Sequence, residues 1–186
     1  MRRYYTMNIA GVECQLPICP LNDKLSIAGF VIFGRPALTT AAAAQLLEKL
    51  PEHDVLVTAE SKGIPLAAEM ARQEGNSRYV VVRKSTKLYM QDPFIHEVRS
   101  ISTDHVQTLC LDREEAEYIK GKRVAIVDDV ISTGESLKAL EALVNAAGGI
   151  IVAKAAILAE GDAADRKDII FLKKLPLFTP EGEPLD

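Results

Sequence analysis

The chain has 186 residues, of which 48% are hydrophobic and 26% charged, a balance that is typical of one globular domain and excludes a disordered chain. Its net charge of -4 gives no reason to expect a nucleic-acid or membrane partner. The apolar runs are too short to cross a bilayer and the three cysteines lack zinc-ligand spacing, so we expect a cytoplasmic protein with free thiols.

Residues 1–35 contain short apolar runs broken by proline and glycine, which indicates short strands and turns. Five later runs rich in Val and Ile lack polar alternation and are expected to be strands buried on both faces: 54–59, 79–83, 123–128, 149–158 and 168–172. Apolar residues at helical spacing indicate helices between them: 40–50, 65–74 and 136–147. This alternation predicts an α/β fold with a mainly parallel central sheet flanked by helices.

The turn after the first buried strand is a candidate anion site. Thr58-Ala59-Glu60-Ser61-Lys62-Gly63-Ile64-Pro65 ends a strand and opens a helix. Backbone N–H groups at a helix start, together with the cation Lys62, suit a bound anion, although an ordinary strand-to-helix turn would look the same in isolation. The next strand ends in three cations, Arg83, Lys84 and Lys87, which in isolation would usually be a solvated face.

Residues 88–121 interrupt the alternation between two core strands. They include possible strands at 98–102 and 105–111, so we expect either an extra hairpin or a mobile lid. His96 and His105 lie in this insertion without metal-ligand spacing, and we expect both to be solvated.

The most informative stretch covers residues 124–137. A hydrophobic strand ends in the carboxylates Asp128 and Asp129, and a turn then leads into a helix. The turn consists of Ser132, Thr133, Gly134, Glu135 and Ser136. Its N–H and hydroxyl groups suit an anion, whereas the carboxylates suit vicinal hydroxyls, and together these describe a phosphorylated ribose. Either half alone would also fit a helix cap or a common turn.

This block closely resembles the 5-phosphoribosyl-1-pyrophosphate (PRPP) signature of type I phosphoribosyltransferases. The resemblance spans residues 38–160, with all three motifs in the family's order. It implies that Asp128 and Asp129 form the catalytic ribose clamp and that residues 132–136 wrap the 5′-phosphate. It implies a pyrophosphate site made of Ser61, Lys62, Gly63, Arg83, Lys84 and Lys87.

Two details of this family bear on the same loops. Its pyrophosphate turn commonly contains a cis peptide, which here would lie near Glu60-Ser61-Lys62. Glu135 departs from the small residue that many members have, so its carboxylate is expected to point away from the phosphate or to weaken its binding.

The resemblance implies a single phosphoribosyltransferase domain with a hood at 1–37, a flexible lid at 88–121 and a loose tail at 180–186. Such a protein is a pentosyltransferase (a glycosyltransferase) that acts in purine salvage, usually as a homodimer. Its Mg²⁺ is carried mainly by PRPP, so no direct protein ligand for the metal is expected.

Residues 60–67 and 105–111 are similar to the effector domain of the purine-operon repressor and to adenine and xanthine phosphoribosyltransferases. This similarity makes adenine the first acceptor to consider, although the adenine enzymes often have a Glu-Tyr pair in the lid and here Glu97 precedes Val98. Phe30 or Phe33 could stack on the base, and both could equally be core anchors.

Two alternatives stay open. The protein could be a non-catalytic sensor of PRPP or of a nucleotide, although the 57 residues before the pyrophosphate turn leave no room for a separate DNA-binding domain. The acceptor could also be another base, such as xanthine, guanine or orotate.

Overall fold

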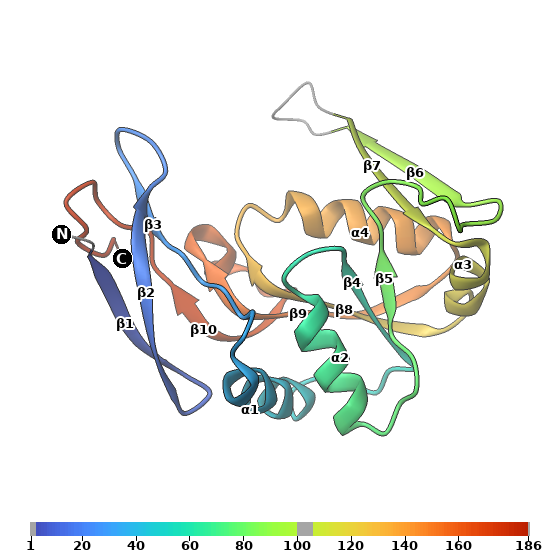
Figure 1. Ribbon diagram of the computed structural model, residues 1–186, viewed down its shortest axis with the longest axis horizontal. Helices are drawn as coiled ribbons and strands as arrows, with labels where there is room; N and C mark the ends of the chain where they lie inside the picture. The colour runs from blue at the N-terminus through green and yellow to red at the C-terminus, as the bar shows by residue number, and fades with distance from the viewer. Residues whose placement is uncertain (1–2, 100–105, 186) are drawn as a thin grey trace.

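The computed structural model describes residues 3–99 and 106–185, and a parallel five-stranded sheet forms its centre (Figure 1). The strands follow one another across this sheet in the order β10-β9-β8-β4-β5. Their bounds are β4 Val55–Ala59, β5 Val80–Val82, β8 Arg123–Ile131, β9 Ile150–Glu160 and β10 Ile170–Leu175. Every residue of β4 is buried, as a strand covered on both faces should be. The predicted α/β fold with a parallel sheet is confirmed.

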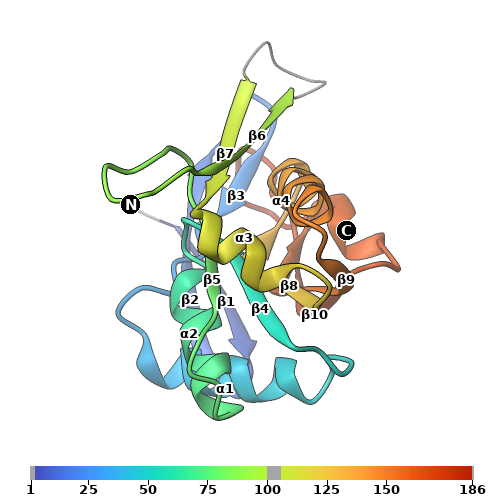
Figure 2. The same ribbon diagram turned by 90° about the vertical axis from the view of Figure 1, so that its right-hand side faces the viewer.

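Helices cover both faces of this sheet (Figure 2). On one face lie α1 (Pro36–Leu47) and α2 (Ile64–Gln73), and on the other lie α3 (Arg113–Ile119) and α4 (Glu135–Ala146). The hydrophobic core is therefore divided by the sheet into two clusters, one under each pair of helices.

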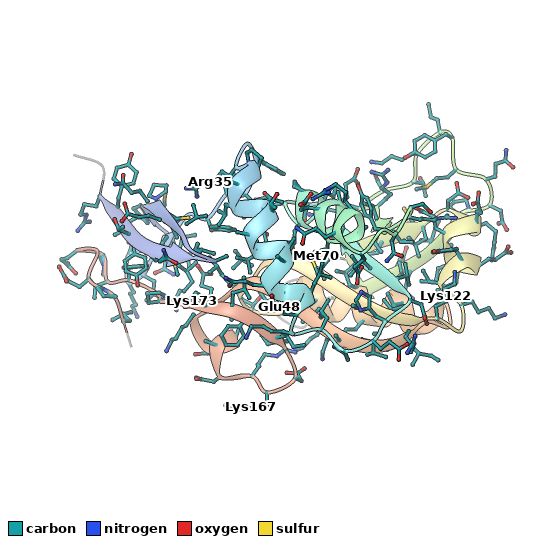
Figure 3. All side chains as sticks on the ribbon, turned by 90° about the horizontal axis from the view of Figure 1, so that it is seen from below. Arg35, Glu48, Met70, Lys122, Lys167 and Lys173 are labelled. Carbon is teal, nitrogen blue, oxygen red and sulfur yellow. The ribbon has the colours of Figure 1, made fainter. Side chains whose placement is uncertain are left out.

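Helix α1 begins four residues earlier than its sequence pattern predicts. Pro36 occupies the first turn, where its fixed φ and missing N–H cost nothing. Figure 3 labels Arg35 and Glu48 at the two ends of α1 and Met70 of the neighbouring α2, a side chain that is fully buried.

The N-terminal strands form a separate antiparallel sheet at one end of the molecule (Figure 1). Their bounds are β1 Tyr4–Ile9, β2 Val12–Pro20 and β3 Ser26–Ala28. Ile9, Leu16 and Phe30 are buried in the same cluster as α1 and α2. The segment expected to be the hood is thus packed directly on the core.

The end of the chain was expected to be loose, and this expectation was wrong. Leu185 N donates to Leu177 O at 2.7 Å, and Arg3 Nη2 donates to Pro180 O at 2.7 Å. The reason is Phe178, which is fully buried and exchanges backbone hydrogen bonds with Ser26 of β3 at 2.8 and 2.9 Å. The C-terminal segment therefore packs on the N-terminal sheet.

The insertion between β5 and β8 contains a hairpin of β6 (Phe94–Arg99) and β7 (Val106–Leu111). Its first strand begins earlier than predicted, and residues 100–105, which include His105, lie outside the described residues. Helix α3 follows the hairpin and was not predicted. Its N-cap is Asp112, whose side chain accepts a hydrogen bond from Glu114 N.

Candidate functional site

The acidic pair of the sequence motif lies inside a strand rather than after it. β8 continues through Asp128 and Asp129 to Ile131, so the prediction that the strand ends at this pair was wrong. Because successive side chains of a strand point to opposite faces, the two carboxylates have different surroundings.

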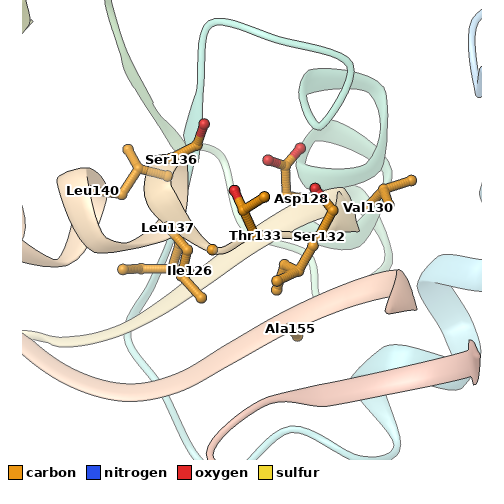
Figure 4. Close-up of a pocket in the computed structure, with 11 residues that line it drawn as sticks. Ile126, Asp128, Val130, Ser132, Thr133, Ser136, Leu137, Leu140 and Ala155 are labelled. Atoms are coloured by element: carbon orange, nitrogen blue, oxygen red, sulfur yellow. The ribbon is translucent and has the colours of Figure 1, made fainter. Parts of the chain in front are cut away.

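Two adjoining cavities of about 80 and 170 Å³ meet at Asp128, and Asp129 lines neither of them. The loop between β8 and α4 walls the first cavity. Figure 4 shows the hydroxyl groups of Thr133 and Ser136 and the Asp128 carboxylate pointing to the same side. The second cavity shares Ser136 and Leu140 of α4 with the first. Its other walls come from three segments: Ala59 at the end of β4 with Ser61 after it, Lys84 after β5, and Thr108 and Leu109 of β7. The predicted phosphate and pyrophosphate loops therefore line adjoining cavities, and Asp128 is the carboxylate that faces both.

Asp128 is held in surroundings that favour its protonated form. Burial raises its pKa most, and the neighbouring Asp129 carboxylate raises it further. Hydrogen bonds to its Oδ1 from Asp129 N at 2.8 Å and from Ser61 Oγ at 3.3 Å act in the opposite direction. An ionised Asp128 would therefore gain from the hydroxyl donors of a bound sugar.

Lys62 links the acidic pair to the hood. Its Nζ lies 2.9 Å from Asp129 Oδ2 and donates a hydrogen bond of 2.9 Å to the carbonyl of Phe30. The Asp129 side chain is only 5% exposed, so this ion pair compensates a nearly buried charge. In this conformation the Lys62 ammonium group is therefore bound to other groups of the protein.

The turn between β4 and α2 packs on Asp128. A Cβ at Gly63 would lie 2.4 Å from Thr58 Oγ1 and 2.8 Å from Asp128 Oδ1, so only glycine fits there. The predicted ribose clamp and pyrophosphate turn are therefore in direct contact. No peptide bond of the described residues is cis, which contradicts the expectation for the bonds near Ser61.

The loop between β8 and α4 has the features of an anion cradle. Gly134 precedes α4 with a left-handed φ of 76° and supplies no side-chain cap. The first helical N–H, that of Glu135, makes only a long hydrogen bond of 3.5 Å to Thr133 Oγ1, so the start of the helix can receive an anion. Ser132, Thr133, Gly134 and Ser136 line the first cavity, and Glu135 does not.

The segment after β5 contacts Glu60, a residue that we did not single out from the sequence, through the cations of Arg83 and Lys87 and the backbone of Lys84. Glu60 Oε1 lies 3.3 Å from Arg83 Nη1 and 3.4 Å from Lys87 Nζ. Its Oε2 accepts a hydrogen bond from Lys84 N at 3.2 Å, the largest of the contacts that lower the Glu60 pKa. The sequence shows this carboxylate in the pyrophosphate turn, but not its pairing with a segment beyond α2.

The aromatic candidates for the base site differ in exposure. Phe30 is 3% exposed and belongs to the core, so it is an anchor and offers no face for stacking. Phe33 is 56% exposed and stays a candidate. In the part of the chain that the structure describes, no group of His, Cys, Asp or Glu side chains could hold a metal ion, and no helix is long and apolar enough to cross a membrane.

Comparisons with known proteins agree with this geometry. The family model of the phosphoribosyl transferase domain matches residues 36–178. An adenine phosphoribosyltransferase of Desulfosudis oleivorans is 32% identical over 130 residues, which cover 70% of this chain and 72% of that protein. A hypoxanthine/guanine phosphoribosyltransferase of Methanococcus voltae is 34% identical over 113 residues, which cover 61% of this chain and 56% of that protein.

A crystal structure shows the same fold. The adenine phosphoribosyltransferase of Rhodothermus marinus matches with a TM-score of 0.64 and 24% identity, over 92% of this chain and 94% of that one. At this identity the match shows the fold alone.

Proposed function

Because the chain belongs to the phosphoribosyltransferase family, we propose that it transfers the 5-phosphoribosyl group of PRPP to a purine base, with adenine as the first acceptor to test. The products are a nucleoside 5′-monophosphate and pyrophosphate, as in purine salvage. The adjoining cavities that meet at Asp128 carry this proposal, since they place an anion cradle beside a cationic turn. Matches to proteins named for adenine, for hypoxanthine and guanine, and for xanthine support a purine acceptor.

The substrate-binding roles follow from the chemistry around Asp128. Residues 132–136 bind the 5′-phosphate through backbone N–H groups and hydroxyls. Asp128 accepts hydrogen bonds from the ribose hydroxyls. The turn at Ser61, Lys62 and Gly63 receives the pyrophosphate together with the nearby cations Arg83, Lys84 and Lys87.

The residues stabilise the separation of charge in the reaction. As the bond from the anomeric carbon to pyrophosphate breaks, its electron pair leaves with pyrophosphate and positive charge develops on the ribose. The lone pair of a ring nitrogen of the base then forms the new bond to that carbon, and the N–H proton of the base is released to the leaving pyrophosphate. Asp128 and Asp129 place negative charge near the ribose, and the cations stabilise the leaving group.

Binding of PRPP requires two exchanges of partner within the protein. Lys62 has to release Asp129 to reach pyrophosphate, because the Asp129 carboxylate and pyrophosphate compete for the same ammonium group. Arg83 and Lys87 have to shift from the Glu60 carboxylate toward the diphosphate. Before PRPP binds, the carboxylates of Asp129 and Glu60 therefore neutralise the charges of these cations.

Mg²⁺ is proposed to arrive with PRPP, where it neutralises charge on the diphosphate. The diphosphate, ribose hydroxyls and water supply the hard oxygen ligands that Mg²⁺ prefers. Asp128 faces both cavities and fits this arrangement, because its carboxylate can accept a hydrogen bond from a water on the metal.

The hairpin β6–β7 is proposed to be the lid, since Thr108 and Leu109 of β7 wall the second cavity. Closing it over the sugar would exclude water, so that hydrolysis does not compete with transfer. The hood at 1–37 would then supply the base pocket. We also propose that the protein is a homodimer and acts in the cytoplasm.

The decisive experiment is to incubate the protein with PRPP, Mg²⁺ and a panel of bases and to follow pyrophosphate release. We expect release with adenine and none without a base. Turnover only with xanthine, guanine or orotate would show that this base, and not adenine, is the acceptor. Tight PRPP binding without turnover on any base would contradict the enzyme and support a sensor.

A further inference from the structure

Arg166 is a cation beside the 5′-phosphate loop that none of the sequence motifs includes. It follows the short 3₁₀ turn η1 (Gly161–Asp165). Its Nε and Nη2 donate to the two carboxylate oxygens of Asp168 at 2.9 and 2.7 Å. A two-point pair of this kind fixes the plane of the guanidinium.

This pair is braced against α4 through β9. Asp168 also accepts a hydrogen bond of 2.5 Å from Lys154 of β9, and Lys154 Nζ lies 3.4 Å from Glu141 Oε1 of α4. The Arg166 and Lys154 contacts hold the pKa of Asp168 well below its usual range. Ion pairs that run from Arg166 through Asp168 and β9 to Glu141 therefore fix the position of Arg166 relative to α4.

The terminal nitrogen that Asp168 leaves free lies against Gly134. A Cβ built at Gly134 would be 2.6 Å from Arg166 Nη1, so the guanidinium fills the space that a side chain would otherwise take. Among the side chains that the structure describes, none accepts a hydrogen bond from Nη1. Gly134 itself lines the first cavity and Arg166 does not, so these N–H donors lie beside the loop that would hold the phosphate.

Arg166 also places a cation, paired with Asp168, beside the start of a helix. The N-terminus of a helix carries the positive end of the helix dipole, so a cation beside it is unfavourable. Helix α4 begins next to Gly134, which supplies no side-chain cap, and the carboxylate of Glu135 is the acidic group in its first turn. A bound phosphate at the loop would be attracted by both the helix and the guanidinium.

We propose that Arg166 donates from Nη1 to the 5′-phosphate of PRPP and is a substrate-binding residue of the reaction. The inference rests on the proposed function, since residues 132–136 have to be the phosphate site. It also accounts for Glu135, because Arg166 adds positive charge at the loop where this chain carries a carboxylate in place of a small residue.

The test compares Arg166→Gln with wild type by titration calorimetry. Three probes separate the subsites: PRPP with Mg²⁺, ribose 5-phosphate, and pyrophosphate with Mg²⁺. Loss of a charged hydrogen bond predicts dissociation constants about tenfold to a hundredfold higher for PRPP and ribose 5-phosphate. The dissociation constant for pyrophosphate should not change. In turnover, KM for PRPP should rise while kcat changes little, because the 5′-phosphate does not react.

Arg72→Gln is the matched control, since Arg72 makes the same kind of two-point pair with Glu69 on α2 and should leave all three affinities unchanged. Arg166→Lys keeps the charge without the fork and should give an intermediate loss, which also covers the case in which Arg166→Gln does not fold. Wild-type affinity for ribose 5-phosphate in either Arg166 variant would overturn the inference. So would an equal loss for pyrophosphate, which would indicate a purely structural role. A wild-type protein that binds neither PRPP nor ribose 5-phosphate would instead refute the proposed function itself.

Discussion

Two adjacent aspartates of β8 differ in what they can do because the strand turns them to opposite faces. Asp129 is nearly buried and is paired with Lys62, whereas Asp128 faces both cavities. The motif that the sequence suggests to be one diol clamp therefore consists of one carboxylate that faces the cavities and one that is paired with a cation. Pyrophosphate would compete for that cation, so binding at one end of the site is coupled to the charge at the other.

The protonation of Asp128 makes a prediction for stability. Its pKa is raised from 3.8 to about 6 in the folded protein, chiefly by burial. Between these values the folded state keeps a proton that the unfolded state has lost, so the free energy of unfolding falls as pH rises through this window. Asp128→Asn removes this effect and should raise the free energy of unfolding by about 1–3 kcal/mol at pH 7.5, with no gain near pH 3.

Urea denaturation at both pH values measures this difference, and Asp23→Asn in an exposed turn of the hood is the control. The same Asp128→Asn variant should bind PRPP more weakly at pH 7.5, because it loses the ionised acceptor for the ribose hydroxyls. If Asp128→Asn were less stable than wild type at pH 7.5, the ionised Asp128 carboxylate would not be destabilising the folded protein.

At the scale of elements, the sequence predicts what depends on local pattern. The runs of Val and Ile locate the strands within a few residues, and the edge of a parallel sheet at which their loops meet follows from the fold. Pairings between distant segments leave no local signal. Glu60 with Arg83, and Arg166 with Gly134, join residues on different loops, so only the folded chain brings them together. Helix α3 was missed because a mixed, charged segment has no clear apolar period.

The contact between the β4–α2 turn and β8 can be tested at Gly63. Gly63→Ala would place a methyl group 2.4 Å from Thr58 Oγ1 and 2.8 Å from Asp128 Oδ1, so the turn has to move off the strand. We expect a loss of about 1–3 kcal/mol in the free energy of unfolding, as for other overpacked sites, and weaker PRPP binding. Thermal denaturation and PRPP calorimetry measure the two effects.

Gly29→Ala is the control for this substitution. Its added methyl group would meet Pro17 at 3.6 Å, an ordinary contact, so stability and PRPP affinity should stay close to those of wild type. If Gly63→Ala bound PRPP as well as wild type does, the close packing of this turn on Asp128 would not matter for the site.

At the scale of the whole molecule, the hood and the parallel sheet share one hydrophobic cluster. Ile9 and Leu16 of the hood belong to the same cluster as Leu46 of α1 and Val127 of β8. Lys62 adds a polar link, since it bridges Asp129 and the Phe30 carbonyl. The N-terminal sheet and the parallel sheet are therefore expected to unfold together, in a single cooperative transition.

Phe178 is the residue that tests this cooperativity, because it is fully buried and joins the C-terminal segment to the hood. Its ring packs edge-on against Tyr5 at a centroid distance of 5.1 Å. Phe178→Ala should lower the free energy of unfolding by about 3–5 kcal/mol, as expected for a large aromatic lost from a core. Urea denaturation followed by circular dichroism, with hydrogen exchange of β1–β3 and β8–β9, should show one transition.

Phe33→Ala is the control, since Phe33 is exposed, and it should change the free energy of unfolding by less than about 0.5 kcal/mol. Early loss of protection confined to β1–β3 would show instead that the hood is a separate folding unit, able to open over the base site without disturbing the sheet.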